Sequence, residues 1–124
     1  MSPWTRRALA TIPGFLACGF TLWPLGYREV SIGARPAPGT WMLLAAIAAV
    51  VAFRILGRGF RWTVGTVVAG FALAVMARVM VEIIADPTTH NLFPFEVAFA
   101  VAIALPGAIV GALVPSLLAR KAAP

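Results

Sequence analysis

The stretch TVGTVVAGFALAVMARVMVEIIA, residues 63–85, decides what kind of protein this chain is. It contains two charged side chains, Arg78 and Glu82, and is otherwise mostly apolar. At a rise of about 1.5 Å per residue, a helix of this length extends roughly 34 Å, which crosses a hydrocarbon core of about 30 Å with some tilt. We therefore expect a transmembrane helix over residues 63–85.

The composition of the whole chain agrees with this expectation. Its 124 residues are 61% hydrophobic and 11% charged, against roughly 45–50% and about 25% in an ordinary soluble domain. A chain of this length cannot bury so many apolar side chains within itself, so the surplus must face lipid or a partner. Three further apolar blocks, residues 8–26, 40–56 and 97–119, are also near spanning length. The sequence predicts an all-α, integral membrane bundle of four transmembrane helices, with residues 1–124 forming a single transmembrane domain.

The first block has an alternative interpretation as a cleaved signal peptide or a lipoprotein processing site. Arg6 and Arg7 precede its apolar run, and Cys18 lies within the run. The run continues past Cys18 to Gly26, which is spanning length rather than signal length. We expect it to be retained as a helix. Because Cys18 is the single cysteine of the chain, no intramolecular disulfide is expected.

The distribution of basic residues predicts the orientation. The arginines are scattered between apolar blocks, so anionic lipid headgroups explain the net charge of +6 better than nucleic acid does. One side of the predicted bundle offers only Arg28 and Arg35. The other side carries seven basic residues: Arg6, Arg7, Arg54, Arg58, Arg61, Arg120 and Lys121. The positive-inside rule therefore places both termini in the cytoplasm, in a multi-pass protein of the bacterial inner membrane.

A polar cluster at the end of the third block is the first candidate site. Arg78, Glu82 and Asp86 are four residues apart, so the first two share a helix face and Asp86 ends the same stripe. Arg78 lies roughly 10 Å inside the outer end of its helix, where an unpaired charge would cost several kcal/mol. We expect an ion pair with Glu82. It either holds the helix in register, with Asp86 and Pro87 ending the helix and starting a turn, or marks an ion path or a charged-ligand site, or contacts a partner subunit.

The following segment, residues 86–96, is the second candidate site. It offers His90, Asn91 and Glu96 as an outer-loop polar site. A lone histidine with irregularly spaced carboxylates is a weak metal signal, and the loop has no serine nucleophile, so no metal, cofactor or catalytic residue is expected. Its apolar residues predict a re-entrant or interfacial segment that holds His90 and Asn91 near the outer surface; these residues are Leu92, Phe93 and Phe95.

Helix contacts leave one further pattern, in the fourth block. Gly107 and Gly111 form a small-xxx-small pair, which lets a neighbouring helix approach closely. Gly and Ala are frequent throughout this chain, so the pattern is also compatible with an ordinary membrane helix. Pro106 lies beside Gly107, and a kink is expected there because a proline removes one helical hydrogen bond.

The sequence DPTTHNLFPFE, residues 86–96, resembles a stretch of uncharacterised small bacterial four-helix integral membrane proteins. That resemblance implies no activity. In length and layout the chain is also similar to the small multidrug resistance exporters and the small fluoride channels. It departs from both, because residues 8–26 contain no acid where the exporters carry their coupling glutamate, and because the Gly-rich, Arg-containing signature of the channels cannot be placed on any block.

These observations favour a non-enzymatic protein, either an accessory subunit of a membrane complex or a homo-oligomer, because four helices enclose little interior. The first alternative is a small transporter or channel that uses Arg78, Glu82 and Asp86 as a charged track. The second alternative is a membrane enzyme with its site on residues 86–96.

Overall fold

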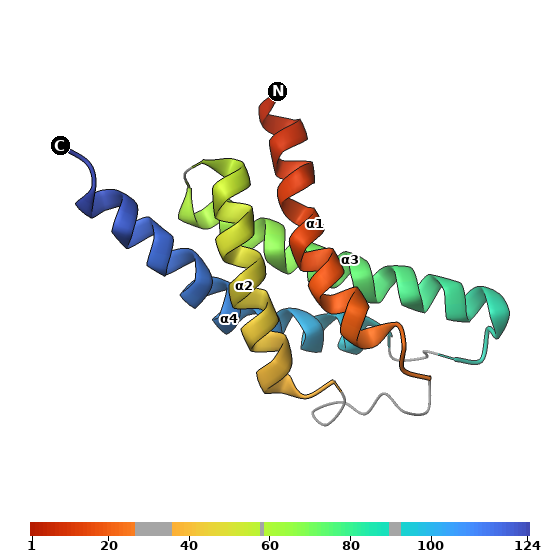
Figure 1. Cartoon of the computed structure of the whole chain (residues 1–124). Coiled ribbons are helices and arrows are strands. Elements are labelled where there is room, and N and C mark those ends of the chain that lie inside the picture. Colours follow the sequence, from red (N-terminus) through yellow and green to blue (C-terminus); the bar gives the residue numbers. More distant parts are fainter. Residues whose placement is uncertain (27–35, 58, 90–92) are drawn as a thin grey trace.

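The computed structural model describes residues 1–26, 36–57, 59–89 and 93–124. These residues form an all-helical structure of four helices, which confirms the all-α part of the prediction (Figure 1). The helices are α1 (Pro3–Leu22), α2 (Pro38–Leu56), α3 (Phe60–Ala85) and α4 (Phe93–Lys121).

Three of the helices, α2, α3 and α4, are long and apolar enough to cross a membrane. Helix α1 is not among them, although the sequence predicts a spanning helix over residues 8–26. The helix begins earlier than that block, at Pro3, and therefore includes Arg6 and Arg7. It also ends earlier, at Leu22, before Pro24. Its apolar part is shortened to residues 8–22.

Local sequence explains where the helices begin and end. Ser2 accepts a hydrogen bond from the backbone N–H of Thr5, and Pro3 occupies the first turn of α1, where its missing N–H costs nothing. Between α2 and α3, Gly57 has φ +80° and Gly59 has φ +117°. Only glycine adopts such angles readily, so this short turn starts α3 directly beside the end of α2.

Helix α4 begins before its predicted block. Pro94 and Phe95, which the sequence analysis assigned to a re-entrant or interfacial segment, lie in its first turn, where a proline is tolerated. Pro106 and Pro115 lie inside the helix, and the ribbon of α4 bends along its length in Figure 1.

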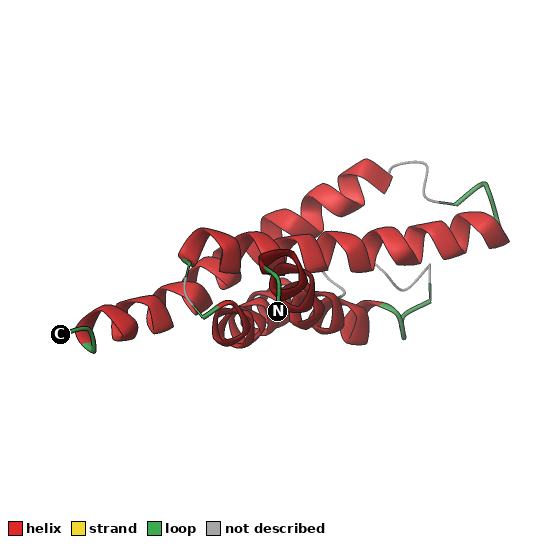
Figure 2. Ribbon diagram, turned by 90° about the horizontal axis from the view of Figure 1, so that it is seen from above, coloured by secondary structure: helices red, strands yellow, loops and turns green. Residues whose placement is uncertain are grey.

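The helices pack as two principal pairs: α1 packs mainly on α3, and α2 packs mainly on α4. Helix α3 crosses α1 and α2 at a steep angle, as the two views in Figures 1 and 2 show together. The interior contains mainly small side chains, and Phe71 is the largest fully buried one. Eight of the buried residues are alanines of α2 and α4: Ala45, Ala48, Ala49, Ala52, Ala100, Ala104, Ala108 and Ala112.

Large apolar side chains cover the outside of the molecule instead of the inside. Phe20 is 76% exposed, Ile84 79% and Leu118 61%, and they come from three different helices. Soluble monomers rarely expose contiguous apolar surface of this kind. Small residues inside and large apolar residues outside are the arrangement of helices that pack within lipid.

Candidate functional site

The candidate site lies where α1 crosses α3. At the crossing, Gly70 of α3 faces Gly14 of α1, and a Cβ atom on Gly70 would lie 2.5 Å from the backbone oxygen of Thr11. The two backbones are therefore in contact. Ala74 and Arg78 follow Gly70 at intervals of four residues, which keeps them on the same face of α3, and both are buried. The crossing thus directs Arg78 toward the carboxyl end of α1.

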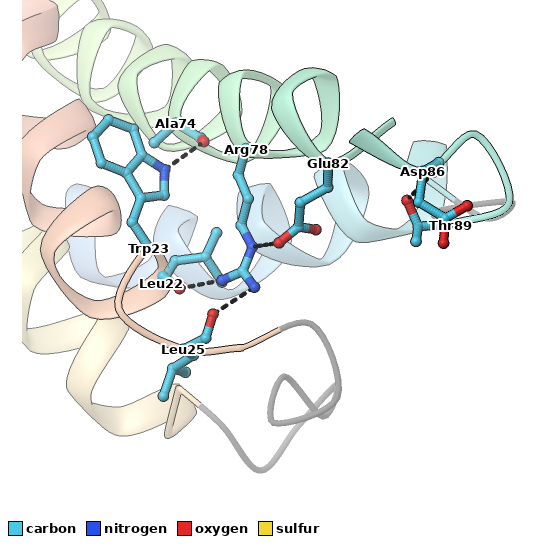
Figure 3. Close-up of polar contacts among 8 residues, drawn as sticks. All are labelled: Leu22, Trp23, Leu25, Ala74, Arg78, Glu82, Asp86 and Thr89. Atoms are coloured by element: carbon cyan, nitrogen blue, oxygen red, sulfur yellow. Dashed lines mark hydrogen bonds and ion pairs between the residues drawn. The ribbon is translucent and has the colours of Figure 1, made fainter. Parts of the chain in front are cut away.

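Arg78 uses each nitrogen of its guanidinium (Figure 3). Nε donates to Oε1 of Glu82 at 2.9 Å, and this pair is the predicted i, i+4 ion pair. Nη1 donates to the backbone oxygen of Leu22, and Nη2 donates to that of Leu25 at 2.7 Å. The Arg78 side chain is 7% exposed and that of Glu82 is 24% exposed. The charge is thus buried, neutralised and hydrogen-bonded at once.

The backbone contacts of Arg78 are made with carbonyl groups at the carboxyl end of α1. The last four carbonyl groups of a helix lack partners within it and carry the negative end of the helix dipole. Leu22 is the last residue of α1, and Leu25 lies in the turn that follows. A guanidinium supplied by α3 therefore caps the carboxyl end of α1 from outside that helix.

Two tryptophans strengthen this end of α1. Nε1 of Trp23 donates to the backbone oxygen of Ala74 at 3.2 Å, and its ring packs edge-on against Phe15 at 5.1 Å between centroids. Nε1 of Trp41, on α2, donates to Oγ1 of Thr21 at 2.8 Å. The end of α1 is thereby bonded to both α2 and α3. We define the α1 clasp as the side chains of Arg78, Glu82 and Trp23, together with the carbonyl groups to which Arg78 and Trp23 donate. These carbonyl groups belong to Leu22, Leu25 and Ala74.

The amino end of α1 is held by a different contact. The guanidinium carbon of Arg7 lies 3.4 Å from the ring centroid of Trp62 on α3 and 5.1 Å from that of Trp4. An arginine over a tryptophan face is attracted by the ring quadrupole, and more strongly when water is excluded. Helix α1 is thus attached to α3 near both of its ends.

Asp86, the third member of the predicted stripe, has a local role in the structure. It is the C-cap residue of α3, and its Oδ1 accepts bonds from the backbone N–H of Thr88 at 3.0 Å and from Oγ1 of Thr88 at 2.7 Å. These hydrogen bonds hold the pKa of Asp86 below its usual value. In Figure 3 Asp86 lies away from the guanidinium of Arg78. The structure therefore joins Arg78 with Glu82, whereas Asp86 shapes the turn.

The predicted outer-loop site is only partly described. His90 and Asn91 lie outside the described residues, and Glu96 lies in the first turn of α4. A carboxylate in a first turn is favoured by the positive end of the helix dipole. Within the described ranges, no group of three or more His, Cys, Asp or Glu side chains is placed to hold a metal ion.

Gly107 and Gly111 both face α2. A Cβ atom would lie 2.8 Å from the carbonyl carbon of Met42 at the first position and 2.7 Å from that of Ala46 at the second. Real Cβ atoms do not approach so closely, so both positions require glycine for α4 to lie against α2 as it does. The contact places the backbones of α2 and α4 against each other along two turns.

The sequence did not link four residues to this site: Gly14, Trp23, Trp41 and Gly70. One available signal was the four-residue spacing of Gly70, Ala74 and Arg78, which places two small residues on the face of the buried arginine. No residue-type signal marks a backbone carbonyl as a partner, so the link from Arg78 to α1 was not predictable.

Comparison with protein-family models, curated protein sequences and solved structures found no match to this chain. The site is therefore interpreted from its own geometry.

Proposed function

We propose that this chain is a four-span protein of the bacterial inner membrane that works as a non-enzymatic part of a membrane assembly, as a homo-oligomer or as an accessory subunit. Both termini lie in the cytoplasm in this proposal. The three apolar helices support the membrane placement. The assembly role is argued from the bonding of the buried charge and from the close packing of the helices.

The fourth span in this proposal is α1. Its 20 residues extend about 30 Å, which matches the hydrocarbon core of a bilayer. Arg6 and Arg7 lie near its start, where long side chains can place their charge among headgroups. The contact of Arg7 with Trp62 brings this basic end beside the start of α3, where Arg61 adds a further positive charge. This grouping supports a cytoplasmic location for that end under the positive-inside rule.

One observation carries the assembly role: the single strongly buried charge among the described side chains is already paired and hydrogen-bonded within the chain. Each guanidinium nitrogen of Arg78 donates to an oxygen of α1, of the following turn or of Glu82. The helix pairs are closed by direct backbone contact at Gly70, Gly107 and Gly111. Such an interior leaves little room for a passage, so the large apolar outer surface is the part available for recognition.

Site-specific photo-crosslinking in intact membranes tests this proposal. A photoreactive phenylalanine analogue replaces Phe20, which is 76% exposed, and in a matched control replaces Phe71, which is fully buried. We expect cross-links to a second protein chain from position 20 and none from position 71. The same label at the exposed positions Ile84 and Leu118 samples the other faces. If every exposed position yields only lipid adducts, the assembly role is wrong.

Small-ion or proton transport is the second candidate function, and one observation favours it. Glu82 is 24% exposed while bonded to a buried arginine, so an ionisable group connects the interior with the surface. Under this alternative, Glu82→Gln abolishes flux in proteoliposomes while the protein stays folded. A folded wild-type protein that conducts nothing under imposed proton and ion gradients eliminates the alternative.

A further inference from the structure

A groove opens where the ends of α2 and α4 meet the start of α3. Its volume is about 290 Å³, close to the lower end of the ~300–1,000 Å³ typical of small-molecule sites. Phe53, Phe60 and Ala119 form apolar walls, while Ser116 and Arg120 supply the polar groups. The groove therefore joins an apolar slot to a guanidinium.

The surroundings of the groove are strongly basic. Arg54 and Arg61 are exposed and directly follow the wall residues Phe53 and Phe60 in sequence. Lys121 follows Arg120. The acids near the other end of α3 are distant, since Glu82 lies about 33 Å and Asp86 about 39 Å along the helix axis from Phe60. Among the described side chains, the groove is thus flanked by basic residues and lies far from the carboxylates of α3.

We propose that this groove binds one anionic phospholipid, with its phosphate against the guanidinium of Arg120 and an acyl chain along Phe53 and Phe60. Arginine recognises phosphate through two parallel N–H donors, and basic recesses between transmembrane helices on the cytoplasmic side suit anionic headgroups. A lipid supplies both the negative charge and the apolar chain that the lining demands. The inference needs the proposed membrane placement but does not depend on the assembly role.

Native mass spectrometry of the full-length chain tests the site. The protein is exchanged into detergent, mixed with dioleoylphosphatidylglycerol or dioleoylphosphatidylcholine, and the lipid-bound fraction is measured. We expect one retained phosphatidylglycerol, bound several-fold more strongly than phosphatidylcholine. Arg120→Gln should weaken binding about fivefold, the factor that one basic residue contributes at an anionic surface. Lys121→Gln removes the same charge one residue away, outside the lining, and should weaken binding less than Arg120→Gln does.

A second variant separates the contribution of the apolar groove to lipid binding from that of the charge. Ala119→Phe fills the groove and keeps Arg120, so it should also reduce phosphatidylglycerol retention. Circular dichroism and size-exclusion chromatography show whether each variant is folded, and Ser116→Phe replaces Ala119→Phe if the latter unfolds.

Three results would overturn the proposal. Equal losses in Arg120→Gln and Lys121→Gln would indicate a diffuse basic surface. Equal retention of phosphatidylcholine would remove the role of the charge. Displacement of phosphatidylglycerol by glycerol phosphate at equal concentration would show that the headgroup alone is recognised. The lipid result is independent of photo-crosslinking, so a lipid-binding chain without a protein partner would refute only the assembly role.

Discussion

The contact between α1 and α3 and the contact between α2 and α4 both use glycine for close backbone approach, but the residues around the glycines differ. Each brings two backbones together at glycine, at Gly70 in the first and at Gly107 and Gly111 in the second. The α1–α3 contact adds polar bonds at both ends, through Arg78 and Arg7. The α2–α4 contact continues instead with small, buried alanines.

The difference follows from how helices associate in lipid. Apolar burial between helices provides little driving force there, because lipid tails are as apolar as leucine, so close packing and hydrogen bonds must hold the helices together. Helix α1 is long enough to span but is less apolar than the three candidate spans, because it includes Arg6 and Arg7. It is also the one that receives the charged cap and the tryptophan bonds. The α1–α3 contact should therefore be sensitive to loss of polar groups, and the α2–α4 contact to added volume.

The largest effect is expected from Arg78→Met. The substitution keeps much of the side-chain bulk but removes the three guanidinium hydrogen bonds to Glu82, Leu22 and Leu25. Breaking a buried, bonded charge pair costs about 3–5 kcal/mol, and we expect a loss near the lower value because Glu82 is partly exposed. Unfolding in bicelles with increasing denaturing detergent measures this. The control is Arg61→Met, exposed on the same helix, with an expected change within about 0.5 kcal/mol. Equal effects from both variants would contradict the clasp.

Gly111→Ala tests the other contact by adding volume. The new Cβ would meet the carbonyl carbon of Ala46 at 2.7 Å, so α2 and α4 must separate. Overpacking of this kind costs about 1–3 kcal/mol. Gly65→Ala on α3 is the matched control, since nothing lies within 4 Å of its added Cβ. This control should be neutral or stabilising by up to about 1 kcal/mol. A tolerated Gly111→Ala would show that the α2–α4 contact does not depend on backbone proximity.

Trp41→Phe should have a smaller effect. It removes the bond from Nε1 to Oγ1 of Thr21 while keeping an aromatic ring against Phe71, 5.8 Å away between centroids. The expected loss is about 1 kcal/mol, the net worth of one hydrogen bond. The same detergent unfolding measures it, and Trp4→Phe, at a 75% exposed position, is the control. No difference between the two would mean that the α1–α2 bond contributes little.

The smallest effect concerns the pH dependence of Asp86. Its pKa is lower in the folded protein than in the unfolded chain, so its contribution to stability is complete above the unfolded pKa of about 3.9 and is lost as the pH falls through the folded value. Asp86→Asn should therefore lose less stability than the wild type upon acidification from about pH 5 to pH 3. The other carboxylates titrate in both proteins, so the difference between the two curves reports Asp86. Identical curves would contradict the Thr88 bonds.

Part of this picture could be predicted from sequence. The four apolar blocks predicted helices, and the four-residue spacing predicted that Arg78 and Glu82 share a face, because both inferences depend only on local periodicity. The carboxyl end of the first helix was predicted too late, because Trp23 and Leu25 extend the apolar run on both sides of Pro24, whereas α1 ends at Leu22. The pairing of helices depends on distant contacts such as Gly70 with Gly14. Small residues are too frequent in this chain for composition alone to identify those contacts.

Asp86 has the turn-starting role expected under the register interpretation, and its side chain does not extend the ion pair. Its spacing continues the stripe of Arg78 and Glu82, but α3 ends at Ala85, so helical periodicity no longer applies to its side chain. The local bonds with Thr88 then determine its position.

Hydrogen exchange of the backbone amides at the carboxyl end of α1 tests the central claim, that Arg78 caps this helix from α3, most directly. In Arg78→Met, the amides of residues 19–23 and of Leu25 should exchange at least about tenfold faster than in the wild type, while those of the α2–α4 contact change much less. Unchanged protection of residues 19–23 and Leu25, or equal acceleration in both contacts, would contradict the account.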